Sequence, residues 1–146
     1  MDAESIINCY GYNVVRFPFL ISPSLTPAKK HFYDVIESTI KGNKEIEMLA
    51  DSYRSTLSFH TAAALLIDVI EGYGETAPKI LNICGDDDLS KYDVGVKIAE
   101  KLRLNKNLIV PITINENNDF FEVKRAQTTL MDNSKLKSLL KIKKIK

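Results

Sequence analysis

The chain has 146 residues, of which 45% are hydrophobic, and a formal net charge of +1. This length and apolar content allow one domain with its own core, and a charge so close to zero does not favour nucleic acid as a partner. Cys9 and Cys84 lie far apart without a CxxC pair, which argues against a disulfide framework or a zinc site. No apolar run reaches the roughly 20 residues that span a membrane, and no signal peptide is evident. We therefore expect a cytoplasmic protein that binds neither nucleic acid nor membrane.

The N-terminal third predicts a helix, a strand and a second helix. Residues 3–9 can form a short helix, and the β-branched and aromatic stretch YNVVRFPFLI at residues 12–21 is typical of a buried strand. Thr26 followed by Pro27 predicts a helix start, with the threonine as N-cap and the proline at the first helical position. Gly42 would end that helix.

Two strands and one helix are predicted in the middle of the chain. EIEML at residues 45–49 alternates as a strand does, and Ser58 can cap a helix that ends at Gly72. KILNIC at residues 79–84 is a second candidate for a buried strand. The helix between these strands carries the apolar residues Ala62, Ala63, Leu66, Ile67 and Ile70.

An acidic run separates the second buried strand from the next helix. We expect Asp86–Asp88 to form a solvated loop whose charge suits a following helix N-terminus. The run lacks the ligand spacing of a calcium loop, so we predict no metal site. Ser90 and Asp93 resemble a capping box and open a helix. That helix would bury Val94, Ile98, Ala99 and Leu102.

The C-terminal part is expected to be extended and then helical. LIVPITI at residues 108–114 is extended, with a proline that suggests a sheet edge, and residues 120–132 are mostly extended after a polar loop. Asn133 or Ser134 starts the last helix, with leucines 136, 139 and 140 inward. The lysine-rich end is predicted to be a frayed, solvated tail.

Motifs that carry chemistry are missing from the sequence. There is no GxGxxG, no GxxxxGK[ST], and no tyrosine with a lysine four residues later. The two histidines, His31 and His60, have no neighbouring cysteine or serine constellation of the kind that a hydrolytic triad needs. We therefore predict no catalytic residue in this chain.

Two arginines are the best candidates for a binding site. Arg54 lies close before an apolar helix, where a planar guanidinium could clamp a phosphate; the alternative is a surface arginine paired with Asp51 or another carboxylate. Arg125 is the second candidate, and its alternative is a solvated strand end.

Three stretches, at residues 53–55, 81–102 and 124–142, resemble the C-terminal half of dTDP-4-dehydrorhamnose reductase-like proteins. These belong to the extended short-chain dehydrogenase/reductases, and the resemblance covers nearly the whole chain. The matching positions are Tyr53, Arg54 and Ser55, then Gly85, Asp86, Leu89, Ser90, Lys91 and Tyr92, and finally Arg125, Asp132, Asn133, Ser134, Lys135 and Leu136.

The resemblance implies an α/β fold made of the last strands of a Rossmann sheet and a small mixed α/β substrate-binding lobe. The cofactor-binding N-terminal half, with its Gly-rich loop and Tyr-x-x-x-Lys pair, would be absent. Residues 1–146 would then form a single substrate-binding-type domain that binds no cofactor alone, whereas the complete family enzyme would use NADPH or NADH.

The resemblance further implies that the ligand is a nucleotide-diphosphate sugar. Arg54 and Arg125 would hold its diphosphate and nucleoside, with Tyr53 and Phe19 as further substrate-binding residues. Hydride transfer would need a cofactor-binding half on another chain, and a homo-oligomer is the other assembly expected. The alternative is a non-catalytic regulatory or binding module, or a degraded gene fragment related to that family.

Overall fold

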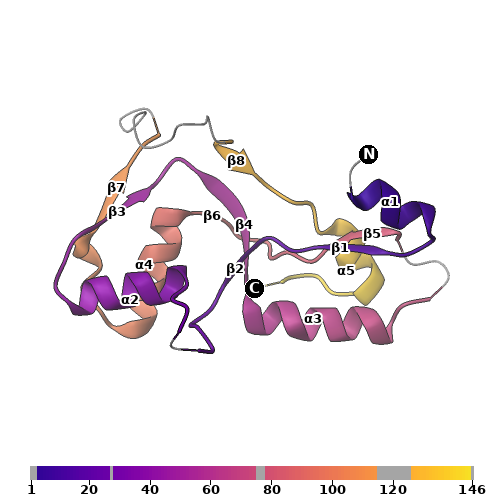
Figure 1. Cartoon of the computed structure of the whole chain (residues 1–146), viewed down its shortest axis with the longest axis horizontal. Coiled ribbons are helices and arrows are strands. Elements are labelled where there is room, and N and C mark those ends of the chain that lie inside the picture. Colours follow the sequence, from indigo (N-terminus) through magenta and orange to yellow (C-terminus); the bar gives the residue numbers. More distant parts are fainter. Residues whose placement is uncertain (1–2, 27, 75–77, 115–125, 146) are drawn as a thin grey trace. The chain divides into compact units, whose positions relative to one another are not determined.

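The computed structural model describes residues 3–26, 28–74, 78–114 and 126–145. The chain divides into two compact units, each built from separate stretches of sequence. The first unit consists of residues 1–20, 55–87 and 131–146, and the second of residues 21–54 and 88–130. Figure 1 shows the elements of both units along the chain. That residues 1–146 form one functional domain stays a prediction.

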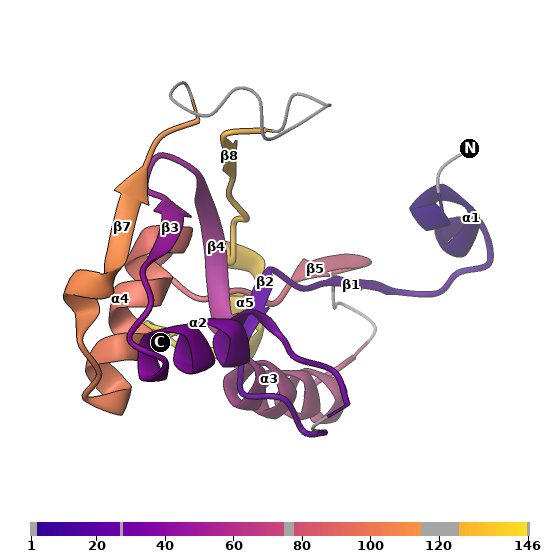
Figure 2. The same cartoon turned by 60° about the vertical axis from the view of Figure 1, so that its left-hand side comes forward.

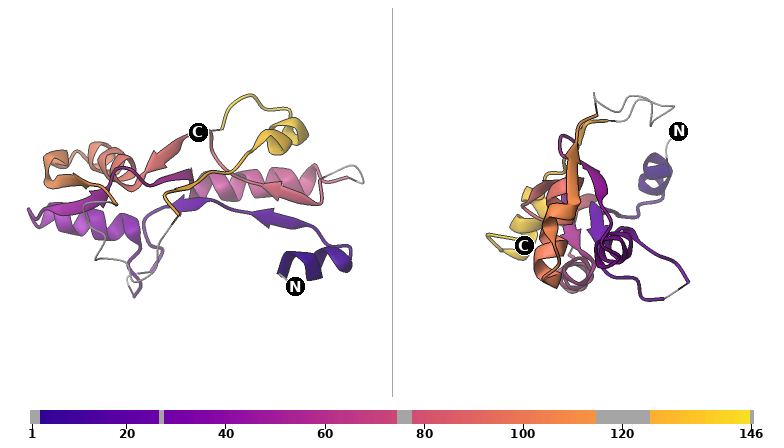
Figure 3. Two further views of the ribbon diagram at one scale, coloured as in Figure 1. Left: turned by 90° about the horizontal axis from the view of Figure 1, so that it is seen from above. Right: turned by 90° about the vertical axis from the view of Figure 1, so that its left-hand side faces the viewer.

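The first unit is built on a parallel pair of strands. Strand β1 (Val14–Arg16) pairs with β5 (Ile80–Asn82), with Val14 opposite Ile80. The helices of this unit are α1 (Ala3–Cys9), α3 (Phe59–Glu71) and α5 (Ser134–Leu140). Helix α5 packs against β5 and α3, whereas α1 lies apart from α3 and α5 and buries none of its residues (Figure 3).

One apolar cluster holds the first unit together. It combines residues of β4 (Tyr53–Ser58), which runs from the second unit into the first, with residues of α3, β5, α5 and the C-terminal segment. Leu81, Ile83 and Leu136 have no exposed surface. The buried members are Leu57, Ala62, Leu65, Val69, Leu81, Ile83, Leu136 and Ile145.

The second unit packs two helices against a second parallel pair of strands. Strand β3 (Ile46–Leu49) pairs with β7 (Ile109–Ile112), and α2 (Phe32–Lys41) packs against α4 (Lys91–Leu102) (Figure 2). The remaining elements are β6 (Asp88–Ser90), the 3-10 turn η1 (Lys106–Leu108) and β8 (Thr128–Thr129), and β2 (Phe19–Ile21) enters this unit from the first.

Gly95 brings α4 close to the strands of the second unit. A Cβ atom at this position would lie 2.5 Å from Sδ of Met48 on β3. The core around it contains Tyr33, Ile36, Ile40, Met48, Val94, Ile98, Ala99 and Ile109. The missing side chain of Gly95 therefore lets α4 pack closely against the strands. The cost is a lower helix propensity, because a glycine in the middle of a helix is destabilising.

The helix caps confirm the local predictions. Ser58 caps α3, where its hydroxyl accepts the N–H of Thr61, and Gly72 ends the helix. Ser90 and Asp93 form the capping box of α4, and Asn133 is the N-cap of α5. These signals act within a few residues, so sequence alone suffices to find them.

The predicted N-terminal strand at residues 12–21 is wrong in two respects. It is broken into β1 and β2 around Pro18, and none of the residues of β1 or β2 is fully buried. Proline lacks the N–H that a continuous ladder requires. Arg16 at the end of β1 forms an ion pair with Glu4 of α1.

The predicted helix start at Thr26 is also wrong, because α2 begins at Phe32. The carboxylate of Asp34 accepts the backbone N–H of His31 at 2.8 Å and that of Ser24 at 3.1 Å. These bonds tie Ser24 and His31 to the first turn of α2, whose N-cap is His31, five residues after Thr26. Pro27 lies outside the described residues.

Helix α3 buries only part of its apolar surface. Ala62, Leu65 and Val69 are buried, whereas Ile67 is 55% and Ile70 66% exposed. The helix is apolar around most of its circumference, so hydrophobicity could not distinguish the core side from the outer side.

The C-terminal end is not a solvated tail. Ile145 is 3% exposed and joins the core of the first unit, with Ile142 packed against it. Its N–H donates to Oδ2 of Asp86 at 3.1 Å, and its carbonyl accepts the N–H of Asp86 at the same distance. The expectation that residues 86–88 form a solvated loop is therefore wrong for Asp86.

Candidate functional site

Arg54 lies in strand β4, four residues before the helix cap, and not in a loop at the helix mouth. Strand β4 pairs in parallel with β8, so that Tyr53 lies opposite Thr128 and Arg54 opposite Thr129. The paired residues are 75 positions apart in sequence, which is why local sequence gave no sign of the strand.

The guanidinium of Arg54 is held by main-chain carbonyls. Nη1 donates to the carbonyl oxygen of Tyr53 at 2.7 Å and to that of Gln127 at 3.1 Å, and Nη2 donates to that of Ala126 at 2.8 Å. These contacts use three of the five N–H groups of the side chain. Carbonyls carry no formal charge, so the bonds orient the guanidinium without neutralising it.

Asp51, the alternative partner for Arg54, makes other contacts. Its two carboxylate oxygens each accept the N–H of Ile114 at 3.1 Å, and Oδ2 also accepts Nε2 of Gln127 at 3.3 Å. We call Asp51, Arg54, Ala126 and Gln127 the β4–β8 network.

Only two of the four predicted site residues are brought together in one described network. Tyr53 is 41% exposed and adjoins Arg54 on β4, and its N–H donates to the carbonyl of Gln127 at 3.0 Å. Phe19 is half-buried on β2 and belongs to the first unit. Arg125 lies outside the described residues.

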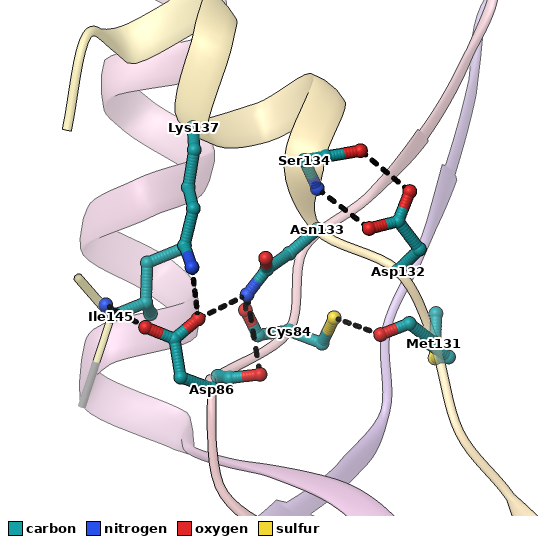
Figure 4. Close-up of polar contacts among 9 residues, drawn as sticks. Cys84, Asp86, Met131, Asp132, Asn133, Ser134, Lys137 and Ile145 are labelled. Atoms are coloured by element: carbon teal, nitrogen blue, oxygen red, sulfur yellow. Dashed lines mark hydrogen bonds and ion pairs between the residues drawn. The ribbon is translucent and has the colours of Figure 1, made fainter. Parts of the chain in front are cut away.

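A second polar network lies in the first unit and surrounds Asp86 (Figure 4). Its carboxylate accepts Nζ of Lys137 at 2.5 Å, Nδ2 of Asn133 at 2.8 Å and the N–H of Ile145 at 3.1 Å. The amide of Asn133 also donates to the carbonyls of Cys84 at 3.0 Å and Gly85 at 3.3 Å.

These contacts lower the pKa of Asp86 from 3.8 to about 2. The ion-paired Lys137 contributes most, followed by Asn133 and the N–H of Ile145. Asp132 also has a lowered pKa, because both the hydroxyl and the N–H of Ser134 donate to it. Sequence reasoning missed the Asp86 network, whose members are 47 to 59 positions from Asp86.

Within the described ranges no group of three or more histidine, cysteine or acidic side chains could hold a metal ion. Across the same ranges no helix is long and apolar enough to cross a membrane.

Solved structures place the chain in a fold class. It is similar to dTDP-4-dehydrorhamnose reductases from Bacillus anthracis str. Ames, solved in complex with NADP, and from Clostridium acetobutylicum, each with a TM-score of 0.71 over 92% of this chain. Sequence identity is 16% and 19%, and the chain covers 44% and 45% of those proteins. A UDP-N-acetylglucosamine 4-epimerase from Bacillus cereus has a TM-score of 0.68 at 21% identity, over 98% of this chain and 46% of its own.

The fold is thus mixed α/β and corresponds to a portion of the short-chain dehydrogenase/reductase fold, as the resemblance implied. The chain spans less than half the length of these solved structures. Residues 2–146 match the model of the RmlD substrate binding domain, and the chain belongs to this family. No curated protein matches it.

Proposed function

We propose that the chain binds a nucleotide-diphosphate sugar, as the substrate-binding half of a dTDP-4-dehydrorhamnose reductase-like NAD(P)-dependent oxidoreductase whose hydride-transfer residues lie outside this chain. The observation that supports it most directly is Arg54, whose guanidinium is oriented by three uncharged carbonyl groups. Membership in a substrate-binding-domain family supports the same function.

In this proposal Arg54 acts by electrostatics and geometry. A planar guanidinium pairs with phosphate oxygens through two parallel N–H donors, and within the described part of the chain its contacts leave Nε–H and one Nη2–H to do so. By the resemblance to the family, Arg125, Tyr53 and Phe19 are the further residues proposed to bind the substrate. A nicotinamide cofactor of the complete enzyme would supply the hydride. This chain's residues bind and orient the sugar nucleotide.

Isothermal titration with UDP-glucose and dTDP-glucose tests the binding. We expect Arg54→Ala to weaken it by roughly 10- to 150-fold, the effect of losing hydrogen bonds to a charged group. Arg54→Lys should recover part of the loss, because it restores the charge without the planar pair of donors.

Arg103→Asn is the matched control. It removes an exposed arginine of the same unit from a left-handed position that asparagine tolerates, and it should leave binding unchanged. Equal affinity of wild type and Arg54→Ala would contradict the assignment of Arg54.

The proposed second half needs a surface on which to dock, and the first unit exposes apolar side chains on α3. Phe59 is 50%, Ile67 55% and Ile70 66% exposed. Contiguous exposed apolar residues mark interaction sites. We expect the isolated chain to self-associate in analytical ultracentrifugation, and the double variant Ile67→Lys, Ile70→Lys to sediment as a monomer.

Val35→Lys serves as control for this experiment, since Val35 is an apolar residue that is 43% exposed on α2. It should leave the association unchanged. A wild-type chain that is monomeric at all concentrations and melts in one sharp transition would count against a missing partner.

The second candidate is a non-catalytic regulatory or binding module, or a degraded fragment. The absence of a Tyr-x-x-x-Lys pair from the sequence favours it. Turnover of a keto-sugar nucleotide on addition of a cofactor-binding polypeptide would exclude this alternative, whereas binding without any such turnover would support it.

A further inference from the structure

Asp51 connects the segment after β7 with the start of β8. Its carboxylate accepts the N–H of Ile114, two residues beyond β7, and the side-chain amide of Gln127, just before β8. A third bond, from the N–H of Ala50 to the carbonyl of Ile112 at 2.9 Å, fixes the chain immediately before Asp51. Asp51 is therefore held in place and in turn fixes both segments.

Gln127 passes this restraint on to Arg54. Its carbonyl accepts the N–H of Tyr53 at 3.0 Å and Nη1 of Arg54 at 3.1 Å. The side chain of Gln127 is bound to Asp51 and its main chain to Arg54. A displacement of Gln127 would thus remove one carbonyl from the guanidinium and disturb the neighbouring carbonyl of Ala126.

The location of Asp51 also raises a competing expectation. A carboxylate in the same network as a phosphate-binding arginine would repel a diphosphate if it acted only through its charge. Removing that charge would then tighten binding. If Asp51 acts by holding Gln127, removing its acceptor oxygen must weaken binding, so the two roles predict opposite signs.

We propose that Asp51 is a positioning residue for Arg54, which it holds in the orientation that binds a diphosphate by restraining Gln127. This inference rests on the proposed function. In this proposal the carboxylate of Asp51 fixes the orientation of the Arg54 guanidinium without having to touch the ligand itself.

The test is titration of the full chain with UDP-glucose and dTDP-glucose. Asp51→Ala removes both carboxylate oxygens, so that Gln127 loses its side-chain acceptor, and we expect the Kd to rise about 2- to 12-fold, the effect of one lost neutral hydrogen bond. In an Arg54→Lys background, Asp51→Ala should produce no further rise, because lysine has no planar group to orient.

Asp34→Ala is the matched control. Asp34 lies in the same unit and likewise accepts backbone N–H groups, those of Ser24 and His31, without a bond to the β4–β8 network. It should leave the Kd unchanged, which separates positioning from a general loss of stability.

The outcomes distinguish this inference from the function on which it rests. A wild-type chain that binds neither nucleotide sugar overturns both. Wild-type binding that weakens in Arg54→Lys but is unchanged or tighter in Asp51→Ala overturns only the role of Asp51. An Asp51→Ala effect of equal size in the wild-type and Arg54→Lys backgrounds also overturns it, because a residue that acts through Arg54 cannot have an effect independent of Arg54.

Discussion

Replacement of Gly85 by alanine is expected to destabilise the first unit by about 3 kcal/mol. A Cβ at Gly85 would lie 2.6 Å from the carbonyl oxygen of Thr56. This oxygen belongs to β4 and already accepts the N–H of Gly85 at 3.2 Å, so it cannot move away without breaking a backbone hydrogen bond. Thr56 is itself only 6% exposed, which leaves the strand little room to shift.

Urea unfolding monitored by circular dichroism measures this effect. Gly74→Ala is the control, because a Cβ at Gly74 meets none of the described residues within 4 Å. It should change stability by less than about 0.5 kcal/mol, as surface substitutions do. If the two alanine variants unfold at the same urea concentration, the close approach of Gly85 to β4 is not required.

Removal of the Asp86 carboxylate has the other large expected effect. Asp86→Ala should cost about 3 kcal/mol, since it leaves Lys137, Asn133 and the N–H of Ile145 without their shared acceptor. The same measurement on Asp68→Ala, an exposed acidic residue of α3, should show almost no change. Equal midpoints for the two variants would contradict a stabilising role for the network.

The lowered pKa of Asp86 gives this contribution a defined pH dependence. The folded state holds the pKa at about 2, whereas the ordinary value is 3.8. Because the folded pKa is the lower one, the stabilisation is complete above pH 3.8 and is lost as the pH falls from there towards 2. The difference in unfolding free energy between wild type and Asp86→Asn should shrink across that range, and a constant difference would contradict the assignment.

The elements with local signals were predictable from sequence. The caps at Ser58 and Ser90, and the end of α3 at Gly72, depend on residues within one turn. Strand β4 was not predictable, because its pairing with β8 joins Tyr53 to Thr128. The burial of the C-terminal segment was not predictable either. Ile145 has lysines as its neighbours in the sequence, and its burial goes with the bond of its backbone to Asp86, 59 positions earlier.

The candidate site was predictable in part. The predictable part consists of residues that match the dTDP-4-dehydrorhamnose reductase-like family. Of the matching residues, several contact one another: Asn133 donates to Asp86, and the hydroxyl of Ser134 donates to Asp132. These positions support the fold. Arg54 was singled out by its charge, yet two of the three carbonyls that orient it lie more than seventy residues away, beyond the reach of local reasoning.

The reciprocal bonds between Ile145 and Asp86 have a practical consequence for handling the protein. An affinity tag fused directly after residue 146 starts one residue from the buried side chain of Ile145. When the tag binds an immobilised resin, the contact between Ile145 and Asp86 is the first one that it can disturb. Helix α1 buries none of its residues. A tag before residue 1 should therefore leave the thermal transition unchanged, whereas a C-terminal tag should lower it.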